Sequence, residues 1–69
     1  MVKKIIIKTE YITLGQFLKF TSIISNGSHA KFFLSENEVY VNGELENRRG
    51  RKLYPGYNVV VFGVEYIVE

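Results

Sequence analysis

Cysteine is absent from this sequence of 69 residues. The chain therefore has neither a disulfide framework nor a thiolate metal site to support a small core, and its composition fits a reducing compartment. Long apolar runs are absent too, because Val59–Phe62, one of the longest, falls far short of the roughly 20 residues that span a bilayer. The start at Met1–Lys4 lacks the apolar stretch and cleavage site of a signal peptide. We therefore expect a soluble, cytoplasmic protein.

The residue types that commonly carry catalysis are also scarce. Aspartate is absent, and His29 is the only histidine. One imidazole without cysteine or aspartate does not make a convincing metal site or catalytic triad. The chain also has no plausible pair of nucleophile and base, and it has little room for a pocket. The sequence thus predicts a protein that is not an enzyme and that folds without a metal or cofactor.

Apolar residues are plentiful for the size of the chain. They make up 46% of the sequence, and they include five Phe and five Tyr. A chain of this length buries roughly 60% of the surface that its unfolded form exposes, so nearly every large apolar side chain should contribute to the core. We expect a single domain over residues 1–69 that folds as a monomer.

Positive charge is concentrated in one short segment. The formal net charge is only +2, which does not by itself imply nucleic acid. However, four of the nine lysines and arginines lie within five consecutive residues with no acid among them, namely Arg48, Arg49, Arg51 and Lys52. Arginine presents a planar fork of donors that matches phosphate oxygens, and Gly50 would let the backbone come close to a ligand or turn sharply. The segment is either a phosphate clamp or a solvated loop that keeps the protein soluble.

Patterns in the first half of the chain predict one strand and two helices. β-Branched residues flanked by lysine predict a strand over Lys3–Lys8, where the lysines of an edge strand would discourage aggregation. Thr13 and Gln16 have the spacing of a capping box, and apolar residues then recur at helical spacing. These signals predict a helix from about Leu14 to Ile24.

A second, shorter helix is expected after a break at Asn26-Gly27. Ser28 can cap this helix, and Asn37 suits the left-handed position that would end it. One face of the helix would be apolar, formed by Ala30, Phe33 and Leu34.

The period of the apolar residues changes to two in the second half of the chain. Val39 and Val41 alternate with polar neighbours, and Asn42-Gly43 is a strong signal for a hairpin turn into a return strand over Glu44–Glu46. Asn47–Lys52 has no periodicity and is expected to be an exposed loop. Pro55-Gly56 predicts a turn, and two further strands, Val59–Phe62 and Glu65–Val68, are expected to join around Gly63.

Several of these residues together resemble a known family. Over about Thr13 to Val61, the chain is similar to the RNA-binding module named after the fourth protein of the small ribosomal subunit, also called the alpha-L RNA-binding motif. The residues that carry the resemblance are Ala30-Lys31, Phe33-Leu34, Val39, Val41, Asn42-Gly43, Leu53 and Pro55-Gly56. The strings Thr13–Lys19 and Asn47–Leu53 resemble more particularly its free-standing bacterial YaaA-type members. The order and spacing of the pieces are specific, although each piece alone is weak.

The resemblance implies a fold and a binding surface. It implies an α+β domain in which two packed short helices lie against a small, mostly antiparallel sheet, the same arrangement that the local patterns predict. It also implies binding of structured RNA, either ribosomal RNA or an assembling ribosome, by the second helix, the preceding turn and nearby basic loops. By position, the RNA-binding residues would be Ser28, Lys31, Arg48, Arg49, Arg51 and Lys52, with His29 and Asn47 as secondary candidates.

Two positions depart from the family pattern. His29 stands where many members have arginine, which would weaken phosphate binding at the start of the helix. Tyr57 replaces an acid after Pro-Gly, which should affect the turn more than binding. Lys31 lies near the start of the second helix, where a phosphate would also meet unpaired N–H groups, although it could equally be an ordinary surface lysine.

The aromatic residues divide into two groups. Element spacing predicts that Phe17, Phe33 and Phe62 belong to the core. Phe32, Tyr40 and Tyr54 are candidates for partial exposure, where they could stack on unpaired bases.

Two other functions remain open at the level of sequence. Phosphate contacts alone do not separate RNA from DNA, so the chain could be a DNA-binding accessory protein. It could also be a protein-interaction module whose basic loop meets an acidic partner. Discrimination in favour of RNA needs recognition of the A-form shape or of the 2′-hydroxyl group.

Overall fold

The computed structural model describes residues 2–69. Seven strands form two sheets, one with the strand order β1-β7-β6-β3-β4 and one that contains only β2 and β5. Every strand pair is antiparallel except β1 with β7. The elements are β1 (Val2–Ile5), β2 (Ile12–Thr13), α1 (Leu14–Phe20), the 3₁₀ turn η1 (Gly27–His29), α2 (Ala30–Glu36), β3 (Val39–Val41), β4 (Glu44–Leu45), β5 (Lys52–Leu53), β6 (Asn58–Val61) and β7 (Val64–Val68).

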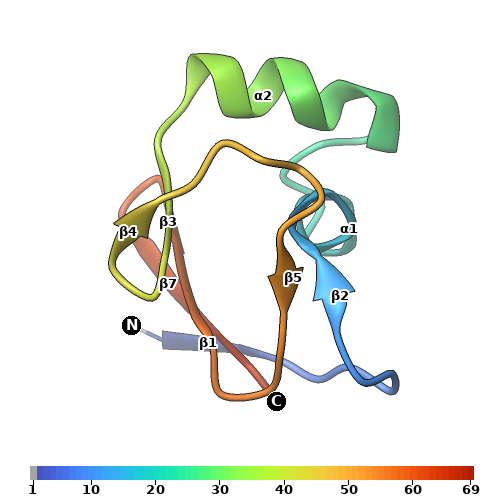
Figure 1. Ribbon diagram of the computed structural model, residues 1–69, viewed down its shortest axis with the longest axis vertical. Helices are drawn as coiled ribbons and strands as arrows, with labels where there is room; N and C mark the ends of the chain where they lie inside the picture. The colour runs from blue at the N-terminus through green and yellow to red at the C-terminus, as the bar shows by residue number, and fades with distance from the viewer. Residues whose placement is uncertain (1) are drawn as a thin grey trace.

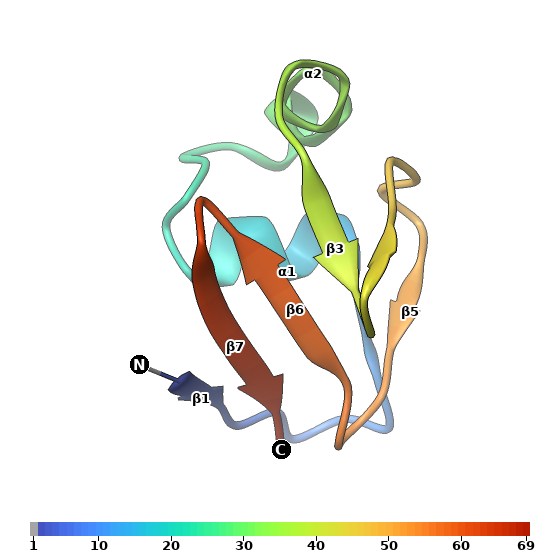
Figure 2. The ribbon, with the colours of Figure 1, turned by 90° about the vertical axis from the view of Figure 1, so that its left-hand side faces the viewer.

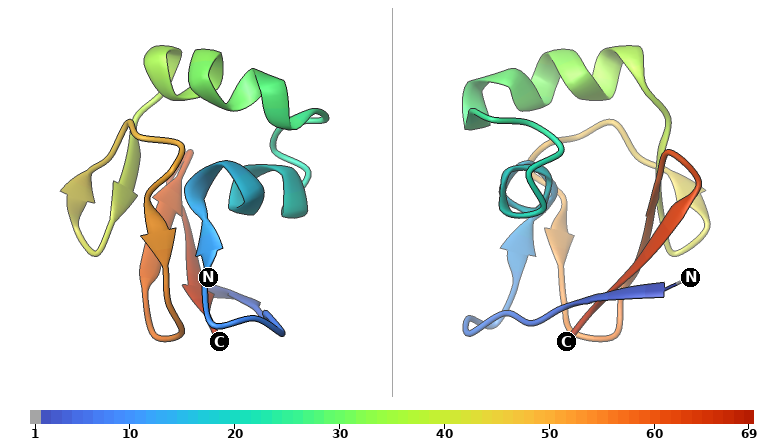
Figure 3. Two further views of the ribbon diagram at one scale, coloured as in Figure 1. Left: turned by 45° about the vertical axis from the view of Figure 1, so that its right-hand side comes forward. Right: turned by 180° about the vertical axis from the view of Figure 1, so that it is seen from behind.

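The arrangement confirms the predicted α+β fold. Helix α1 lies behind β3, β6 and β7, while α2 crosses one end of the molecule above the loop that joins β4 to β5 (Figures 1 and 2). The β2–β5 ribbon stands on the side of the molecule opposite β7 and leads directly into α1 (Figure 3). Within residues 2–69, no helix is both long and apolar enough to cross a membrane.

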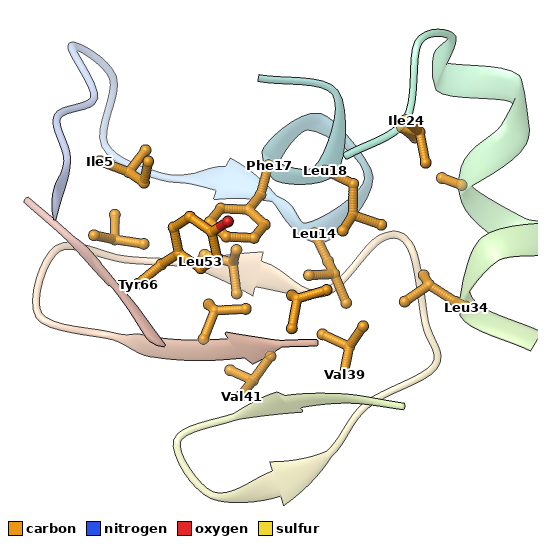
Figure 4. Packing of buried hydrophobic residues seen from close by; sticks show 14 residues of the cluster. Ile5, Leu14, Phe17, Leu18, Ile24, Leu34, Val39, Val41, Leu53 and Tyr66 are labelled. Atoms are coloured by element: carbon orange, nitrogen blue, oxygen red, sulfur yellow. The ribbon is translucent and has the colours of Figure 1, made fainter. Parts of the chain in front are cut away.

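The core lies between α1 and the larger sheet. Leu14, Phe17 and Leu18 of α1 are fully buried, and Phe17 packs edge-on against the ring of Tyr66 with 5.2 Å between centroids. Leu53 of β5 closes the core from the side of the ribbon (Figure 4). The sheet contributes alternate residues, as a half-buried sheet requires; they are Val39, Val41, Val59, Val61 and Val68.

The first helix begins as predicted but ends earlier. The capping box is present, because Thr13 Oγ1 accepts from the amide of Gln16 at 3.2 Å and Gln16 Oε1 accepts from the amide of Thr13 at 2.8 Å. The helix ends at Phe20 instead of Ile24 because Ser22 takes a left-handed conformation with φ of 62°. Ile24 is nevertheless buried, since the chain after the helix folds back to bring it to the core. The apolar spacing therefore predicted correctly that Ile24 is buried, but it predicted wrongly that the helix extends to this residue.

Two expectations for the second helix are wrong. Asn26 caps the 3₁₀ turn η1 that precedes α2, because its Oδ1 accepts from both the amide and the hydroxyl of Ser28 at 2.9 Å. Ser28 therefore lies within η1 and does not cap α2. Asn37 ends α2 in an extended conformation with φ of −135°, and both its amide and its side-chain Nδ2 donate to the carbonyl of Phe33. The helix is thus closed by side-chain hydrogen bonding and not by a left-handed residue.

The hairpin turn at Asn42-Gly43 is confirmed, with φ of 52° and 84° at its two residues. Phe62-Gly63 forms the same kind of turn between β6 and β7. This is why Phe62 is not in the core as predicted: it is 68% exposed, and its ring packs against the half-buried Phe33 ring with 5.6 Å between centroids.

Strand bounds also differ from the predictions. Strand β1 ends at Ile5, three residues before Lys8, although its position at the edge of the sheet is as expected. Lys52 pairs with Thr13 in the β2–β5 ribbon and so does not belong to the preceding loop.

Candidate nucleic-acid interface

The basic segment between β4 and β5 is held against the start of α1. The amide of Leu14 donates to the carbonyl of Arg51 at 2.8 Å, and the amide of Gly15 donates to the carbonyl of Arg49 at 2.9 Å. The first amides of a helix have no hydrogen-bond acceptor within the helix. Here the loop carbonyls accept from them, so the amides of the helix and the carbonyls of the loop both have partners. A Cβ added at Gly15 would lie 3.4 Å from the carbonyl oxygen of Arg49, at the limit of ordinary contact, so the loop packs closely on the start of the helix. The backbone of the basic loop is therefore fixed.

A buried carboxylate shapes this loop from within. Glu46 is only 5% exposed. Its two oxygens accept from the amide of Arg48 at 3.1 Å, from Arg48 Nε at 2.9 Å, from Arg48 Nη2 at 3.0 Å and from Arg51 Nη1 at 2.8 Å. Sequence analysis missed Glu46 because it considered only the run of cations that follows. The sequence does place an acid, Glu46, two residues before Arg48 and so within reach of the cations of the loop, and this could have indicated an ion pair.

The ion pairs keep Glu46 charged despite its burial. The side-chain hydrogen bond from Arg48 lowers the pKa of Glu46 most, and burial opposes this effect. Further hydrogen bonds from the Arg48 backbone and from Arg51 bring the pKa from its ordinary value of 4.5 down to about 2. The hydrogen bond to Glu46 in turn raises the pKa of Arg48. Two of the four cations in the basic segment thus share one permanent negative charge.

The four cations of the segment consequently differ in how freely their side chains can contact a ligand. The Arg51 side chain is only 25% exposed, and its guanidinium lies 5.9 Å from the centroid of the Tyr57 ring. The Arg48 side chain remains 71% exposed even though it is paired. Lys52 Nζ lies 5.0 Å from the centroid of the Tyr11 ring. Arg49 is exposed and makes no ion pair with any residue of the described range 2–69.

A shallow depression brings Arg49 and Gly50 together with both helical segments. Gly27 and Ala30 line it at the start of the second segment, and Lys19 of α1 lines it as well. Its full lining is Thr13, Gly15, Gln16, Lys19, Gly27, Ala30, Arg49 and Gly50. Lys19 was part of the string that resembles the family, but no local pattern assigned it a role. The depression is thus bordered by exposed cations from two separate elements.

The other predicted residues lie beside this depression. Ser28, His29, Lys31 and Asn47 are all exposed. Ser28 and Lys31 are chain neighbours of the lining residues Gly27 and Ala30, whereas Asn47 lies at the far end of the loop, before Arg48. The amides of Ser28, His29 and Ala30 already donate to Asn26 Oδ1, to the Asn26 carbonyl and to the Gly27 carbonyl. These three amides are therefore not free for a phosphate, whereas the Lys31 side chain is exposed.

Two comparisons with known proteins bear on this arrangement. The family described as S4 domain matches residues 5–69. The chain is also 59% identical over 63 residues to a protein of Bacillus subtilis (strain 168) called "Probable ribosome maturation protein RlbA". The aligned region covers 91% of this chain and 89% of that protein, so the similarity extends over nearly the full length of both.

Proposed function

The chain belongs to the S4-domain family, the family of the alpha-L RNA-binding motif, and we propose that it binds structured RNA without catalysing a reaction. The observation that carries the proposal is the depression in which Arg49 and Lys19 meet the start of the second helical segment. An arginine fork can bind a phosphate with two parallel hydrogen bonds, and a lysine adds a point charge. Two such groups on a fixed surface suit the phosphate backbone of a folded RNA.

The geometry supports Arg49 as the principal contact. Its backbone carbonyl is anchored by the Gly15 amide, whereas its side chain has no ion-pair partner in the described part of the chain. A guanidinium that has no ion-pair partner, on a backbone that is held in place, can bind a phosphate without first breaking an internal ion pair. Lys52 and the exposed tip of Arg48 extend the same basic surface, and Ser28, Lys31, His29 and Asn47 flank it.

The similar protein from Bacillus subtilis suggests where such binding occurs. Because that protein is named for ribosome maturation and is 59% identical, we propose that this chain acts in the assembly of ribosomes. Its partner would then be ribosomal RNA or an assembling subunit, and it would work as a monomer in the cytoplasm. A DNA duplex and an acidic protein are the alternatives that the test must include.

The test compares Arg49→Ala with Lys3→Ala, which removes an equally exposed charge from the distant edge strand β1. Binding of a structured ribosomal RNA fragment is measured by fluorescence anisotropy at several salt concentrations. Arg49→Ala should weaken binding to many RNA sequences alike and flatten the log–log salt dependence by about one unit. Lys3→Ala should bind like the parent protein.

Competition distinguishes the partner classes. Unlabelled structured RNA should displace the probe at lower concentration than an equal length of duplex DNA or an acidic protein. If duplex DNA competes better, the protein is a DNA-binding accessory. If neither nucleic acid binds and the acidic protein does, the basic surface is a protein-interaction site. Crosslinking in cells followed by sequencing of the bound RNA would identify the natural target.

A further inference from the structure

A second, apolar hollow lies beside the depression that contains Arg49. It is formed by the segment that joins β1 to β2 together with one side of α1, and its volume of about 680 Å³ lies within the range of ligand pockets. Two of its walls are exposed apolar groups, because Ile6 is 70% exposed and Phe20 is 63% exposed. Tyr11 supplies a second aromatic ring to the lining. Aromatic and aliphatic groups left in water on a small domain indicate an interaction site.

The hollow is continuous with the basic surface. Gln16 lines both the hollow and the depression, so no other element separates them. The Gln16 side chain uses Oε1 to accept from Thr13, which leaves its amide nitrogen to donate to a ligand. Lys52 Nζ, which continues the basic segment, lies 5.0 Å from the centroid of the Tyr11 ring. A chain of phosphates bound at Arg49 could therefore reach the hollow across Gln16.

The chemistry of the hollow favours a nucleobase as its occupant. Tyr11 belongs to a row of half-buried rings, with 5.5 Å between the centroids of Tyr11 and Tyr54 and 5.6 Å between those of Tyr54 and Tyr57. Arg51 and Lys52 lie against the two ends of this row. Aromatic surfaces interleaved with cations are what unpaired nucleotides require, because the bases stack and the phosphates are neutralised. Lys8 adds a further cation to the lining, against the single acid Glu10.

On these grounds we infer that the hollow beside Tyr11 and Phe20 binds an unpaired nucleobase next to the structured part of the RNA. This inference rests on the proposed function and adds a subsite to it. The base would lie against Tyr11 and Phe20, the Gln16 amide would donate to its edge, and Lys52 would meet the adjoining phosphate. The protein would thus recognise a junction between a structured segment and a single strand.

The experiment uses three RNA hairpins that share one stem and loop. The first has a blunt end, the second carries a short unpaired tail, and the third carries a tail of the same length without bases. The parent protein should bind the tailed hairpin at least about fivefold more tightly than the blunt one, as expected for one stacked base. The abasic tail, which keeps the phosphates, should recover little of this gain.

Substitutions then assign the gain to the hollow. Phe20→Ala should abolish the effect of the tail while leaving binding to the blunt hairpin unchanged, since its ring is largely exposed. Tyr11→Ala should act in the same way, and Tyr11→Phe should retain the gain because the stacking ring remains. Phe62→Ala is the matched control: its ring is similarly exposed, at 68%, but it lies in the β6–β7 turn and does not line the hollow.

The outcomes separate this inference from the proposed function. If no hairpin binds the parent protein, both fail. If the blunt hairpin binds and the tails with and without bases bind equally, the proposed function stands and the nucleobase site is refuted. The same holds if Phe20→Ala keeps the gain from the tail. Should Tyr11→Ala fail to fold, Phe20→Ala and Tyr11→Phe decide the matter.

Discussion

Replacement of Glu46 by glutamine tests whether the buried carboxylate holds the basic loop in place. The glutamine side chain has nearly the same shape, but it has only one acceptor oxygen and presents two N–H donors where Glu46 has its second oxygen. One of the two guanidinium groups, either that of Arg48 or that of Arg51, would then face a donor in place of a carboxylate. The substitution therefore breaks a buried ion pair without leaving a cavity.

The lowered pKa gives the size of the effect. A difference between 4.5 and about 2 corresponds to about 3 kcal/mol of preference for the charged form in the folded state. Because the Arg48 side chain is 71% exposed, solvent screens part of this, and we expect Glu46→Gln to reduce the free energy of unfolding by about 2 kcal/mol. For a domain of this size each kcal/mol lowers Tm by about 4–8 °C, so Tm should fall by roughly 8–16 °C.

The pH dependence provides a second, independent check. Since folding lowers the pKa of Glu46, its contribution is fully present above pH 4.5 and is lost as the pH falls through about 2. The gap in Tm between the parent and Glu46→Gln should therefore be widest near neutral pH and narrow steadily below pH 4.5. Thermal unfolding followed by circular dichroism at a series of pH values measures both quantities.

Glu44→Gln serves as the control for this series. Glu44 is an exposed acid on β4, two residues from Glu46, and it makes no ion pair within residues 2–69. Its replacement should change stability by no more than about 0.5 kcal/mol. If Glu46→Gln unfolds at the same temperature as Glu44→Gln at neutral pH, or if its deficit persists unchanged in acid, the carboxylate does not organise the loop.

Three further substitutions separate the roles of the neighbouring cations. Arg49→Lys should restore only part of the affinity that Arg49→Ala loses in anisotropy measurements, because the charge stays while the fork of donors is lost; full restoration would exclude a bidentate contact. Lys31→Ala should weaken RNA binding and change stability by about 0.5 kcal/mol or less, because the side chain is exposed; a large fall in Tm would make Lys31 structural. Arg51→Ala should destabilise the protein more than Arg48→Ala in urea unfolding, because Arg51 is the less exposed partner of Glu46; equal losses would contradict this division.

Local signals predicted the parts of the fold that local chemistry determines. The capping box of Thr13 and Gln16 and the turn at Asn42-Gly43 involve residues within three positions of one another, and both are confirmed. The wrong predictions concern positions where two neighbouring residues suit the same role, or where the tertiary structure determines whether a residue is buried. Asn26 and Ser28 both suit a cap, and only the path of the preceding turn selects Asn26. Phe62 reads as a core residue until its place in a left-handed turn is known.

The site was less predictable than the fold because its electrostatics depend on loop closure. The sequence located the cations, but it could not tell which of them pair internally. Arg51 reaches Glu46 only because the loop returns to β5, and Lys52 meets Tyr11 only because β5 pairs with β2. Both contacts join segments whose proximity no periodicity encodes. The number of cations in such a run is therefore only an upper limit on the positive charge that a ligand can contact, because some of the cations pair within the protein.

Because some cations of the loop pair with Glu46 and Arg49 does not, one short loop can be rigid and still bind a ligand. A five-residue segment of four cations and one glycine, with no acid near it, would repel itself and remain mobile, and a bound phosphate would have to order it at a cost in conformational entropy. Glu46 reduces that repulsion by placing one negative charge between Arg48 and Arg51, while the amides of Leu14 and Gly15 fix the backbone. Because those same amides are satisfied by the loop, the start of α1 cannot itself bind phosphate. What remains for the ligand is a preorganised set of side chains, with Arg49 the least committed, so the affinity of this surface should depend more on where Arg49 is held than on the number of cations around it.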